Sequence, residues 1–183
     1  MQEYVMGNGA IALGALAAGV NLVAGYPGTP SSEILETISK YRHDGVYIEW
    51  SVNEKAAMEV AAAAAYSGAR AMVTMKQVGL NVAADPLMSL AYVGVKGGMV
   101  IVSADDPGPI SSQTEQDTRR FADFCRIPVF DPSSPEEAYK MIGLSIRKNT
   151  TLRFYPDLSP VSVTPMLRLI TAIALHLKNT RAL

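Results

Sequence analysis

A carboxylate at the start of an alanine-rich stretch is the residue best suited to chemistry. Glu54 follows Asn53, which could cap a helix, and the alanines at 61–65 offer almost no other polar group nearby. An acid in the first turn of a helix usually only complements the helix dipole, which is worth a few tenths of a kcal/mol. A carboxyl group at a buried, tightly packed interface can instead share a proton with a ligand nitrogen. The residues alone leave both interpretations open.

Three loops rich in glycine, proline and polar side chains follow predicted strands. They are Tyr-Pro-Gly-Thr-Pro at 26–30, Lys-Gln-Val-Gly-Leu-Asn at 76–81 and Asp-Asp-Pro-Gly-Pro at 105–109. In an open parallel sheet, ligands bind outside the carboxyl ends of the strands. We therefore expect these three loops to share one edge of the sheet.

Short apolar runs alternate with helical patterns from residue 8 to about residue 148. This alternation predicts an α/β fold with a doubly wound, mostly parallel sheet flanked by helices. The predicted helices cover 8–18, 31–41, 54–67, 80–94, 115–125 and 134–148, and the predicted strands cover 21–24, 47–49, 71–75, 99–103 and 128–130. Beyond residue 148, proline-containing pairs interrupt the pattern until an apolar segment at 166–177 that suits a terminal helix.

Other kinds of site find less support. The Gly-Asn-Gly-Ala-Ile-Ala run at 7–12 fits the G-x-G-x-x-A dinucleotide fingerprint, but the strand before it is very short and no acid ends the next strand to hold a ribose. We favour the interpretation that this run begins a helix, and we keep a nucleotide-binding module as an alternative. His43 and His176 have no partners at the spacing of a zinc site or a catalytic triad. The single Cys125 excludes a cysteine-ligated iron–sulfur cluster within one copy of the chain.

The charge balance narrows the function further. The chain holds 16 basic and 17 acidic residues and is 49% hydrophobic, which argues against nucleic acid as a principal partner. The apolar runs at 56–66 and 166–177 are interrupted by Glu59 and Arg168, so neither suits a membrane span. The apolar N-terminal stretch lacks the basic region of a signal peptide. Because the chain has a single cysteine, we expect a cytoplasmic protein. The charge is also unevenly divided, since 1–148 carries 12 basic and 16 acidic residues whereas 149–183 carries four basic and one acidic.

Four separated segments together resemble one family. They lie, in order, at 25–32 (GYPGTPSS), 49–55 (EWSVNEK), 73–88 (VTMKQVGLNVAADPLM) and 104–117 (ADDPGP and SSQTEQD). Through them, residues 5–148 closely resemble the alpha subunit of the indolepyruvate:ferredoxin oxidoreductases. These are thiamine-diphosphate-dependent members of the 2-oxoacid:ferredoxin oxidoreductase family.

The resemblance implies that residues 1–148 form a pyrimidine-binding domain with the thiamine-diphosphate-binding fold. Glu54 matches the catalytic acid that hydrogen-bonds the aminopyrimidine ring of the cofactor. Thr29 matches a substrate-binding hydroxyl near the carboxylate of the 2-oxoacid, although it could equally be a helix N-cap, or both. The implied cofactor-binding residues are Gly28, Glu54, Lys76, Gln77, Gly79 and Asn81, with Gly79 permitting a close backbone approach.

The implied activity is the oxidative decarboxylation of an arylpyruvate to an acyl-coenzyme A, with electrons passing to iron–sulfur clusters and ferredoxin. This chain has no motif for magnesium and diphosphate, so Mg²⁺ is expected on another domain or chain, and the clusters and coenzyme A elsewhere in the assembly. The implied partners are a diphosphate-binding domain, a beta subunit, ferredoxin and further copies in a homo-oligomer, without which the chain should be inactive. The alternative is a non-catalytic domain of the same fold that serves oligomerisation or partner binding.

Two departures from the family qualify these expectations. Related pyruvate enzymes carry an arginine just after the fourth strand for the substrate carboxylate, whereas this chain has Asp105 and Asp106 there. The counter-charge for the carboxylate is therefore unassigned. Residues 149–183 do not match the family, and we expect a divergent or truncated tail there.

Overall fold

The computed structural model describes residues 5–147 and 167–172. Its elements alternate strictly from the first helix to β4 apart from one split helix. The helices are α1 (Gly7–Ala17), α2 (Ser32–Tyr41), α3 (Glu54–Tyr66), α4 (Gln77–Val82), α5 (Ala84–Val93), α6 (Arg119–Cys125) and α7 (Pro135–Arg147). The strands are β1 (Leu22–Gly25), β2 (Tyr47–Trp50), β3 (Ala71–Lys76), β4 (Met99–Ala104), β5 (Val129–Phe130) and β6 (Leu167–Ala172).

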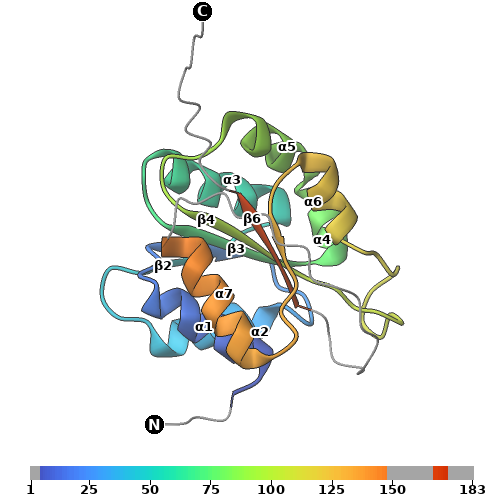
Figure 1. Cartoon of the computed structure of the whole chain (residues 1–183), viewed down its shortest axis with the longest axis horizontal. Helices are drawn as coiled ribbons and strands as arrows, with labels where there is room; N and C mark the ends of the chain where they lie inside the picture. The colour runs from blue at the N-terminus through green and yellow to red at the C-terminus, as the bar shows by residue number, and fades with distance from the viewer. Residues whose placement is uncertain (1–4, 148–166, 173–183) are drawn as a thin grey trace, which may run out of the picture.

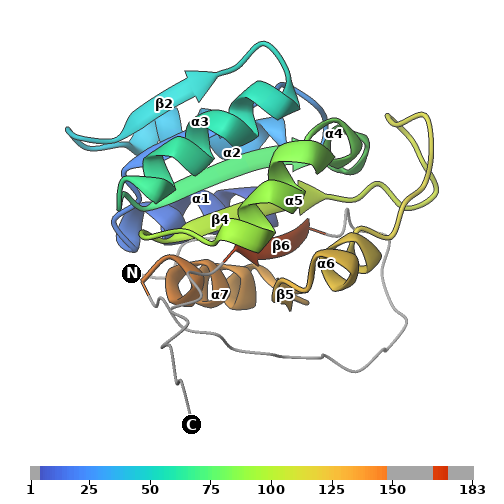
Figure 2. The same ribbon diagram turned by 90° about the horizontal axis from the view of Figure 1, so that it is seen from above.

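One six-stranded sheet, in the order β2-β1-β3-β4-β6-β5, forms the middle layer (Figures 1 and 2). The strands β2, β1, β3 and β4 are parallel to one another, and β6 runs antiparallel to both β4 and β5. Since β1 lies between β2 and β3, the chain winds outward from it in both directions. The predicted doubly wound, mostly parallel α/β fold is confirmed.

Helices cover both faces of the sheet (Figure 1), and each face has its own apolar core. Successive residues of β3 alternate between the two, because side chains along a strand point to opposite faces. Val73 packs with α3 and α5, while Met72 packs with α1, α2 and α7. Small side chains keep the first of these layers close to the sheet: the buried face of α3 consists of Met58 and four alanines, at 57, 61, 62 and 65.

Three predicted elements differ from the structure. The sequence predicts a single helix at 80–94, but the structure has two helices that meet at Ala83. Pro86 has no N–H, so the backbone hydrogen bonds of one helix cannot continue without a break into the other. The helix predicted at 115–125 begins only at Arg119. The terminal helix predicted at 166–177 is wrong over 167–172, where β6 pairs with β4 and satisfies its backbone through the sheet instead.

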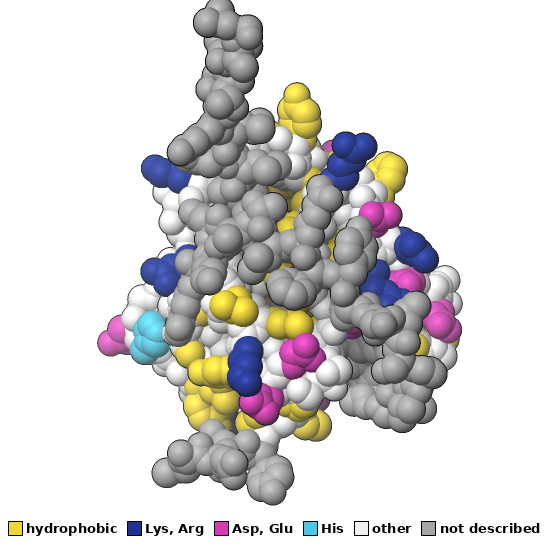
Figure 3. Space-filling view, viewed as in Figure 1, with side chains coloured by type: hydrophobic (Ala, Val, Ile, Leu, Met, Phe, Trp, Pro, Cys, Tyr) yellow, Lys and Arg dark blue, Asp and Glu magenta, His cyan; other side chains and the backbone are white. Residues whose placement is uncertain are grey.

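The predicted division at residue 148 stays a prediction. Beyond it the structure describes β6 alone, which lies within the sheet between β4 and β5. Basic and acidic side chains are interspersed on the face that carries α7, as the described residues in Figure 3 show. No helix in the described ranges is long and apolar enough to cross a membrane.

The contact between α1 and α7 gives a direct test of packing. At Gly14 an added Cβ would lie 2.8 Å from the backbone oxygen of Tyr139 and would also overlap Ile142. We expect Gly14→Ala to lower the free energy of unfolding by about 1–3 kcal/mol, as overpacked cores do. Urea denaturation monitored by circular dichroism measures this change.

Gly143→Ala in α7 is the matched control, because nothing lies within 4 Å of its added Cβ. There the better helix propensity of alanine should raise stability by up to about 1 kcal/mol. Equal effects of the two substitutions would contradict the close α1–α7 contact.

Candidate functional site

The carboxyl ends of β1 and β3 mark the topological switch point of the sheet. The chain leaves β1 toward β2 on one side, and β3 and β4 follow on the other side. In doubly wound folds, ligands bind in the crevice outside the strand ends at this point. The segments that follow β1 and β3 are 26–31 and α4, which carry most of the site residues predicted from the sequence.

Glu54 is the first residue of α3. The side chain of Asn53 caps this helix by accepting a hydrogen bond from the amide of Ala56 at 2.8 Å. Because Asn53 supplies the cap, the Glu54 side chain is not needed to cap the helix. Its carboxylate lies in the first turn, where the helix dipole favours a negative charge. Among the described residues, no group donates a hydrogen bond to its half-buried carboxylate.

The Glu54 carboxylate lies against the backbone of Gly79 in α4. A Cβ added to Gly79 would be 2.6 Å from Cγ and 2.8 Å from Cδ of Glu54, and it would also overlap Oε1. Real Cβ atoms do not come this close to their neighbours, so the contact requires glycine. Two predicted site residues from different helices are thus brought together.

The turn at 26–31 is tied down through Gly28. Its carbonyl oxygen accepts hydrogen bonds at 2.8 Å from both the amide and the hydroxyl of Ser31, and its amide donates to the hydroxyl of Ser32. Ser31, not Thr29, occupies the N-cap position of α2, so the N-cap interpretation of Thr29 is wrong. Thr29 is exposed, and its hydroxyl remains available for a ligand.

Asn8 in α1 holds the other side of this turn. Its amide nitrogen donates to the carbonyl oxygen of Pro30 at 2.9 Å and to the carboxylate of Glu33 at 2.8 Å. Val5 and Met6, which precede the glycine run at 7–12, are not in a strand. That run therefore lacks the strand of a dinucleotide fingerprint and serves helix entry and turn support instead.

The segment 105–118, which we call the strap, folds over the end of β4 and projects from the sheet at the right of Figure 1. Asp105 is buried and accepts hydrogen bonds from the hydroxyl and amide of Thr118, at 2.7 and 3.2 Å. Asp106 accepts from the amides of Ser111 and Ile110, at 2.9 and 3.2 Å. The two acids after β4 thus hold the strap together, and this binding of Thr118 explains why α6 begins later than predicted.

The strap is joined to both other loops by three hydrogen bonds. Lys76 Nζ donates to the Ser111 carbonyl at 2.9 Å, and Gln77 Nε2 donates to the Thr114 carbonyl at 3.0 Å. The Ser111 hydroxyl donates to the Thr29 carbonyl at 3.1 Å. The three loops predicted to share an edge do so, and this prediction is confirmed.

Gly28 and Lys76 are also in contact. An added Cβ at Gly28 would be 3.0 Å from Cδ of Lys76, so the lysine stem runs directly over the turn. Gln77 is fully buried, and its Oε1 has no hydrogen-bond partner among the described groups. Asn81 is not part of this group: it is exposed and lines an open groove of about 460 Å³ with Met88 of α5 and Phe121 and Phe124 of α6.

Ser111, Thr114 and Asn8 contribute to the site although no role is predicted for them from the sequence. The sequence does contain a pattern that could have predicted the strap. Asp106 lies four and five residues before Ile110 and Ser111, whose amides donate to it, in a stretch of Pro, Gly and Ser. Such acids commonly bind nearby backbone amides and shape a loop. No comparable local pattern links Asn8 to Pro30, which is 22 residues away.

No group of three or more His, Cys, Asp or Glu side chains that could hold a metal ion occurs in residues 5–147 and 167–172.

Comparison with known proteins identifies related chains. Residues 13–153 match the family model described as pyruvate flavodoxin/ferredoxin oxidoreductase, thiamine diphosphate-binding. The chain is 56% identical over 138 residues to the indolepyruvate oxidoreductase subunit IorA of Thermococcus kodakarensis, covering 75% of this chain and 21% of that protein. It is 54% identical over 141 residues to IorA of Archaeoglobus fulgidus, covering 74% and 22%. The chain thus spans about a fifth of the length of these relatives.

A solved structure has a similar fold. It is a 2-oxoglutarate:ferredoxin oxidoreductase from Magnetococcus marinus with 2-oxoglutarate, coenzyme A and succinyl-CoA bound. The TM-score is 0.66 at 18% sequence identity, and the match covers 78% of this chain and 26% of the other. This likeness extends to the fold of the described sheet and its helices.

The contact between Gly79 and Glu54 predicts a reversal of sign in a double-mutant cycle. In the wild-type background, Gly79→Ala should lower the free energy of unfolding by about 1–3 kcal/mol, because the new methyl group overlaps the carboxylate. In a Glu54→Ala background the same substitution should raise it by up to about 1 kcal/mol, through helix propensity. Urea unfolding of the four proteins checks this, and the same sign in both backgrounds would contradict the contact.

Asp106 predicts an acid sensitivity of the strap. The hydrogen bond from the Ser111 amide, opposed by partial desolvation and aided by the Ile110 amide, lowers the pKa of Asp106 below its ordinary value of 3.8. A carboxyl group whose pKa is lowered by folding stabilises the protein at pH values above its unfolded-state pKa of 3.8. This stabilisation is lost as the pH falls through the lower pKa of the folded state. The difference in unfolding free energy between wild type and Asp106→Asn should therefore shrink as the pH falls below about 4. A difference independent of pH would show that the charge of Asp106 does not hold the strap.

Proposed function

The chain belongs to the pyruvate flavodoxin/ferredoxin oxidoreductase family of thiamine-diphosphate-binding domains, and on that premise we propose that it forms the pyrimidine-binding portion of an indolepyruvate (arylpyruvate):ferredoxin oxidoreductase. The whole enzyme would convert a 2-oxoacid, coenzyme A and two oxidised ferredoxins to an acyl-coenzyme A, carbon dioxide, two reduced ferredoxins and a proton. The chain would contribute one side of the cofactor site and would be inactive alone.

The observation that carries this proposal is the carboxylate of Glu54. It is half-buried at the switch point, lies against a glycine, and receives no hydrogen bond from the described residues. An acceptor of this kind fits the protonated ring nitrogen of an aminopyrimidine, because a charge-assisted hydrogen bond would compensate its partial burial. When bound, thiamine diphosphate supplies the carbon nucleophile for attack on the 2-oxo group.

Glu54 would act by holding a proton at that ring nitrogen. Its position at a capped helix start, braced by Gly79, limits the directions in which the carboxylate can turn. Such pre-orientation removes the entropy cost of finding the ring in each catalytic cycle. Gly28, Lys76 and Gln77 would lie around the ring. Asn81, which lines the neighbouring groove, would contact the cofactor from the end of α4.

Thr29 would bind on the substrate side of the site. Its hydroxyl is exposed on a turn that Asn8 and Ser111 hold from opposite sides. A fixed hydroxyl beside the reacting carbonyl can donate a hydrogen bond to an anionic 2-oxoacid.

The remaining parts would come from the rest of the polypeptide and its partners. These are a diphosphate-binding domain with Mg²⁺, a beta subunit, iron–sulfur clusters, a coenzyme A site and ferredoxin, in a homo-oligomeric assembly of the cytoplasm. Exposed apolar side chains at the same edge of the sheet suit a covering domain, since Tyr26, Trp50 and Val52 are 40%, 43% and 84% exposed.

Titration with thiamine diphosphate and Mg²⁺ tests the proposal. A suitable host is a chimera in which this chain replaces the matching fifth of the Thermococcus kodakarensis protein, assembled with the partner subunit of that enzyme. Calorimetry should detect binding to the chimera and none to the isolated chain, because we expect the diphosphate and magnesium site on another domain. Absence of binding in both, with stable self-association, would favour a non-catalytic domain of the same fold.

Glu54→Gln tests the role of the carboxylate in the same chimera. The substitution should preserve folding but lower the rate of C2 proton exchange in bound thiamine diphosphate by about 10²- to 10⁴-fold, the usual range for loss of an acid–base group. Proton exchange measured by NMR in deuterium oxide reports this rate. Glu59→Gln, at an exposed position on the same helix, is the matched control and should have no effect. A normal exchange rate in Glu54→Gln would remove the assignment.

A further inference from the structure

A 2-oxoacid carries a carboxylate that needs a cation in its binding site. The acidic residues that follow β4 cannot serve, because Asp105 and Asp106 are negative and are bound within the strap. Within the described residues, a cation that binds the substrate would therefore come from a neighbouring segment at the same edge. This inference rests on the proposed function, which makes a 2-oxoacid the substrate.

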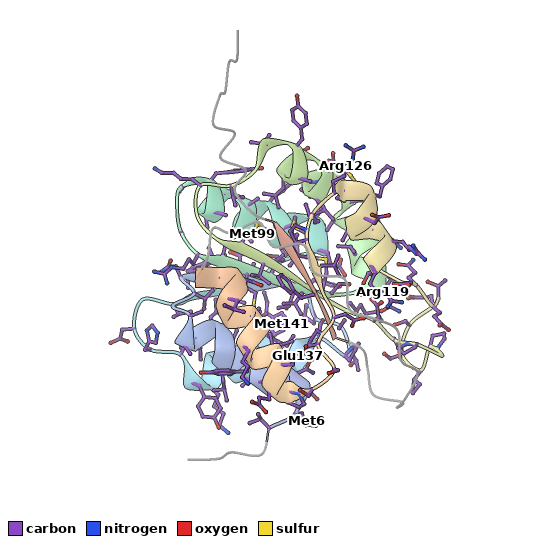
Figure 4. All side chains as sticks on the ribbon, viewed as in Figure 1. Met6, Met99, Arg119, Arg126, Glu137 and Met141 are labelled. Carbon is purple, nitrogen blue, oxygen red and sulfur yellow. The ribbon has the colours of Figure 1, made fainter. Side chains whose placement is uncertain are left out.

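Most cations near this edge already have carboxylate partners. Arg119, labelled at the end of the strap in Figure 4, forms an ion pair of 2.8 Å with Asp117 and a longer one with Asp131. Lys55 forms an ion pair of 2.8 Å with Asp85. Arg120 lies beside Asn81 in the groove along α6 rather than over the turn. Lys76 is the cation that lies over the turn carrying Thr29.

The Lys76 ammonium has unused capacity. Among the described residues it has no carboxylate oxygen within 4.0 Å, and its one hydrogen bond goes to a neutral acceptor, the Ser111 carbonyl, at 2.9 Å. An ammonium group has three donors, so two remain for a ligand. The stem packs over Gly28, which reduces the side-chain entropy lost on binding.

Ser111 links this ammonium to Thr29. Its carbonyl oxygen accepts from Lys76, while its hydroxyl donates to the Thr29 carbonyl at 3.1 Å. The lysine and the threonine are therefore attached to the same residue of the strap, and they lie on adjacent loops of the switch point. A carboxylate has two oxygens and can accept from an ammonium and a hydroxyl together.

We propose that Lys76 binds the carboxylate of the 2-oxoacid through the Nζ hydrogens that Ser111 does not use, with Thr29 beside it. The carboxylate is present in the bound substrate and disappears when its carbon–carbon bond breaks and carbon dioxide leaves. A cation that stabilises the carboxylate equally in the bound substrate and in the transition state lowers KM without raising kcat. Lys76 is then a residue for binding and selecting 2-oxoacids rather than for bond breaking.

The competing explanation is that Lys76 only fastens the strap to β3. Lys76→Met separates the two roles, since methionine keeps the apolar stem over Gly28 and removes the charge. In the chimera, loss of the ammonium should raise KM for indolepyruvate about 10- to 100-fold at nearly unchanged kcat, as expected for a hydrogen bond to a charged group. Lys76→Arg should recover most of the loss, and Lys40→Met, far from the site on α2, is the matched control.

A substrate analogue without the carboxylate charge distinguishes binding of the substrate by Lys76 from a purely structural role of Lys76. The methyl ester of indolepyruvate has the same ring and ketone but no charge, so its inhibition constant should change less than about twofold in Lys76→Met. Equal weakening of acid and ester would overturn the inference while leaving the proposed function in place. A wild-type chimera that binds thiamine diphosphate but does not turn over any arylpyruvate would contradict both.

Discussion

The site depends on the close approach of the Glu54 carboxylate to the backbone of Gly79. These residues lie in the first turns of the helices that follow β2 and β3. The two strands are not neighbours in the sheet, since β1 lies between them. The contact forms because α3 crosses from β2 to β3 over an alanine-rich layer, while a residue without a side chain faces the carboxylate from α4. Small residues thus set the distance between layers. That distance fixes the position of Glu54, a half-buried acid to which no described group donates a hydrogen bond.

Charge at the edge of the sheet is arranged by the strap. Asp105 and Asp106 accept hydrogen bonds from Thr118, Ile110 and Ser111, so their carboxylates are engaged within the strap. The carbonyl groups of the strap in turn accept hydrogen bonds from Lys76 and Gln77. Because these acceptors are neutral, Lys76 keeps its charge available. Although the strap carries two acids, in the described residues it leaves both the Lys76 ammonium and the Glu54 carboxylate without an ion-pair partner.

Local patterns were enough to predict the alternation of helices and strands, the shared loop edge and the cap of α3 by Asn53. They failed where a distant partner decides the outcome. The segment at 167–172 is apolar and could be helical by itself, but pairing with β4 makes it a strand. The helix α6 begins only after Thr118, because the hydroxyl of Thr118 donates a hydrogen bond to Asp105, 13 residues earlier.

The position of the aminopyrimidine ring relative to Glu54 tests the central claim most directly. A structure of the chimera with thiamine diphosphate and Mg²⁺, determined by electron cryomicroscopy, would measure the distance from the Glu54 carboxylate to the ring nitrogen. A separation of about 2.7 Å, typical of a charge-assisted hydrogen bond, is the predicted result, with Gly79 still against the carboxylate. A ring bound elsewhere, or a Glu54 side chain turned away to another protein group, would contradict the account.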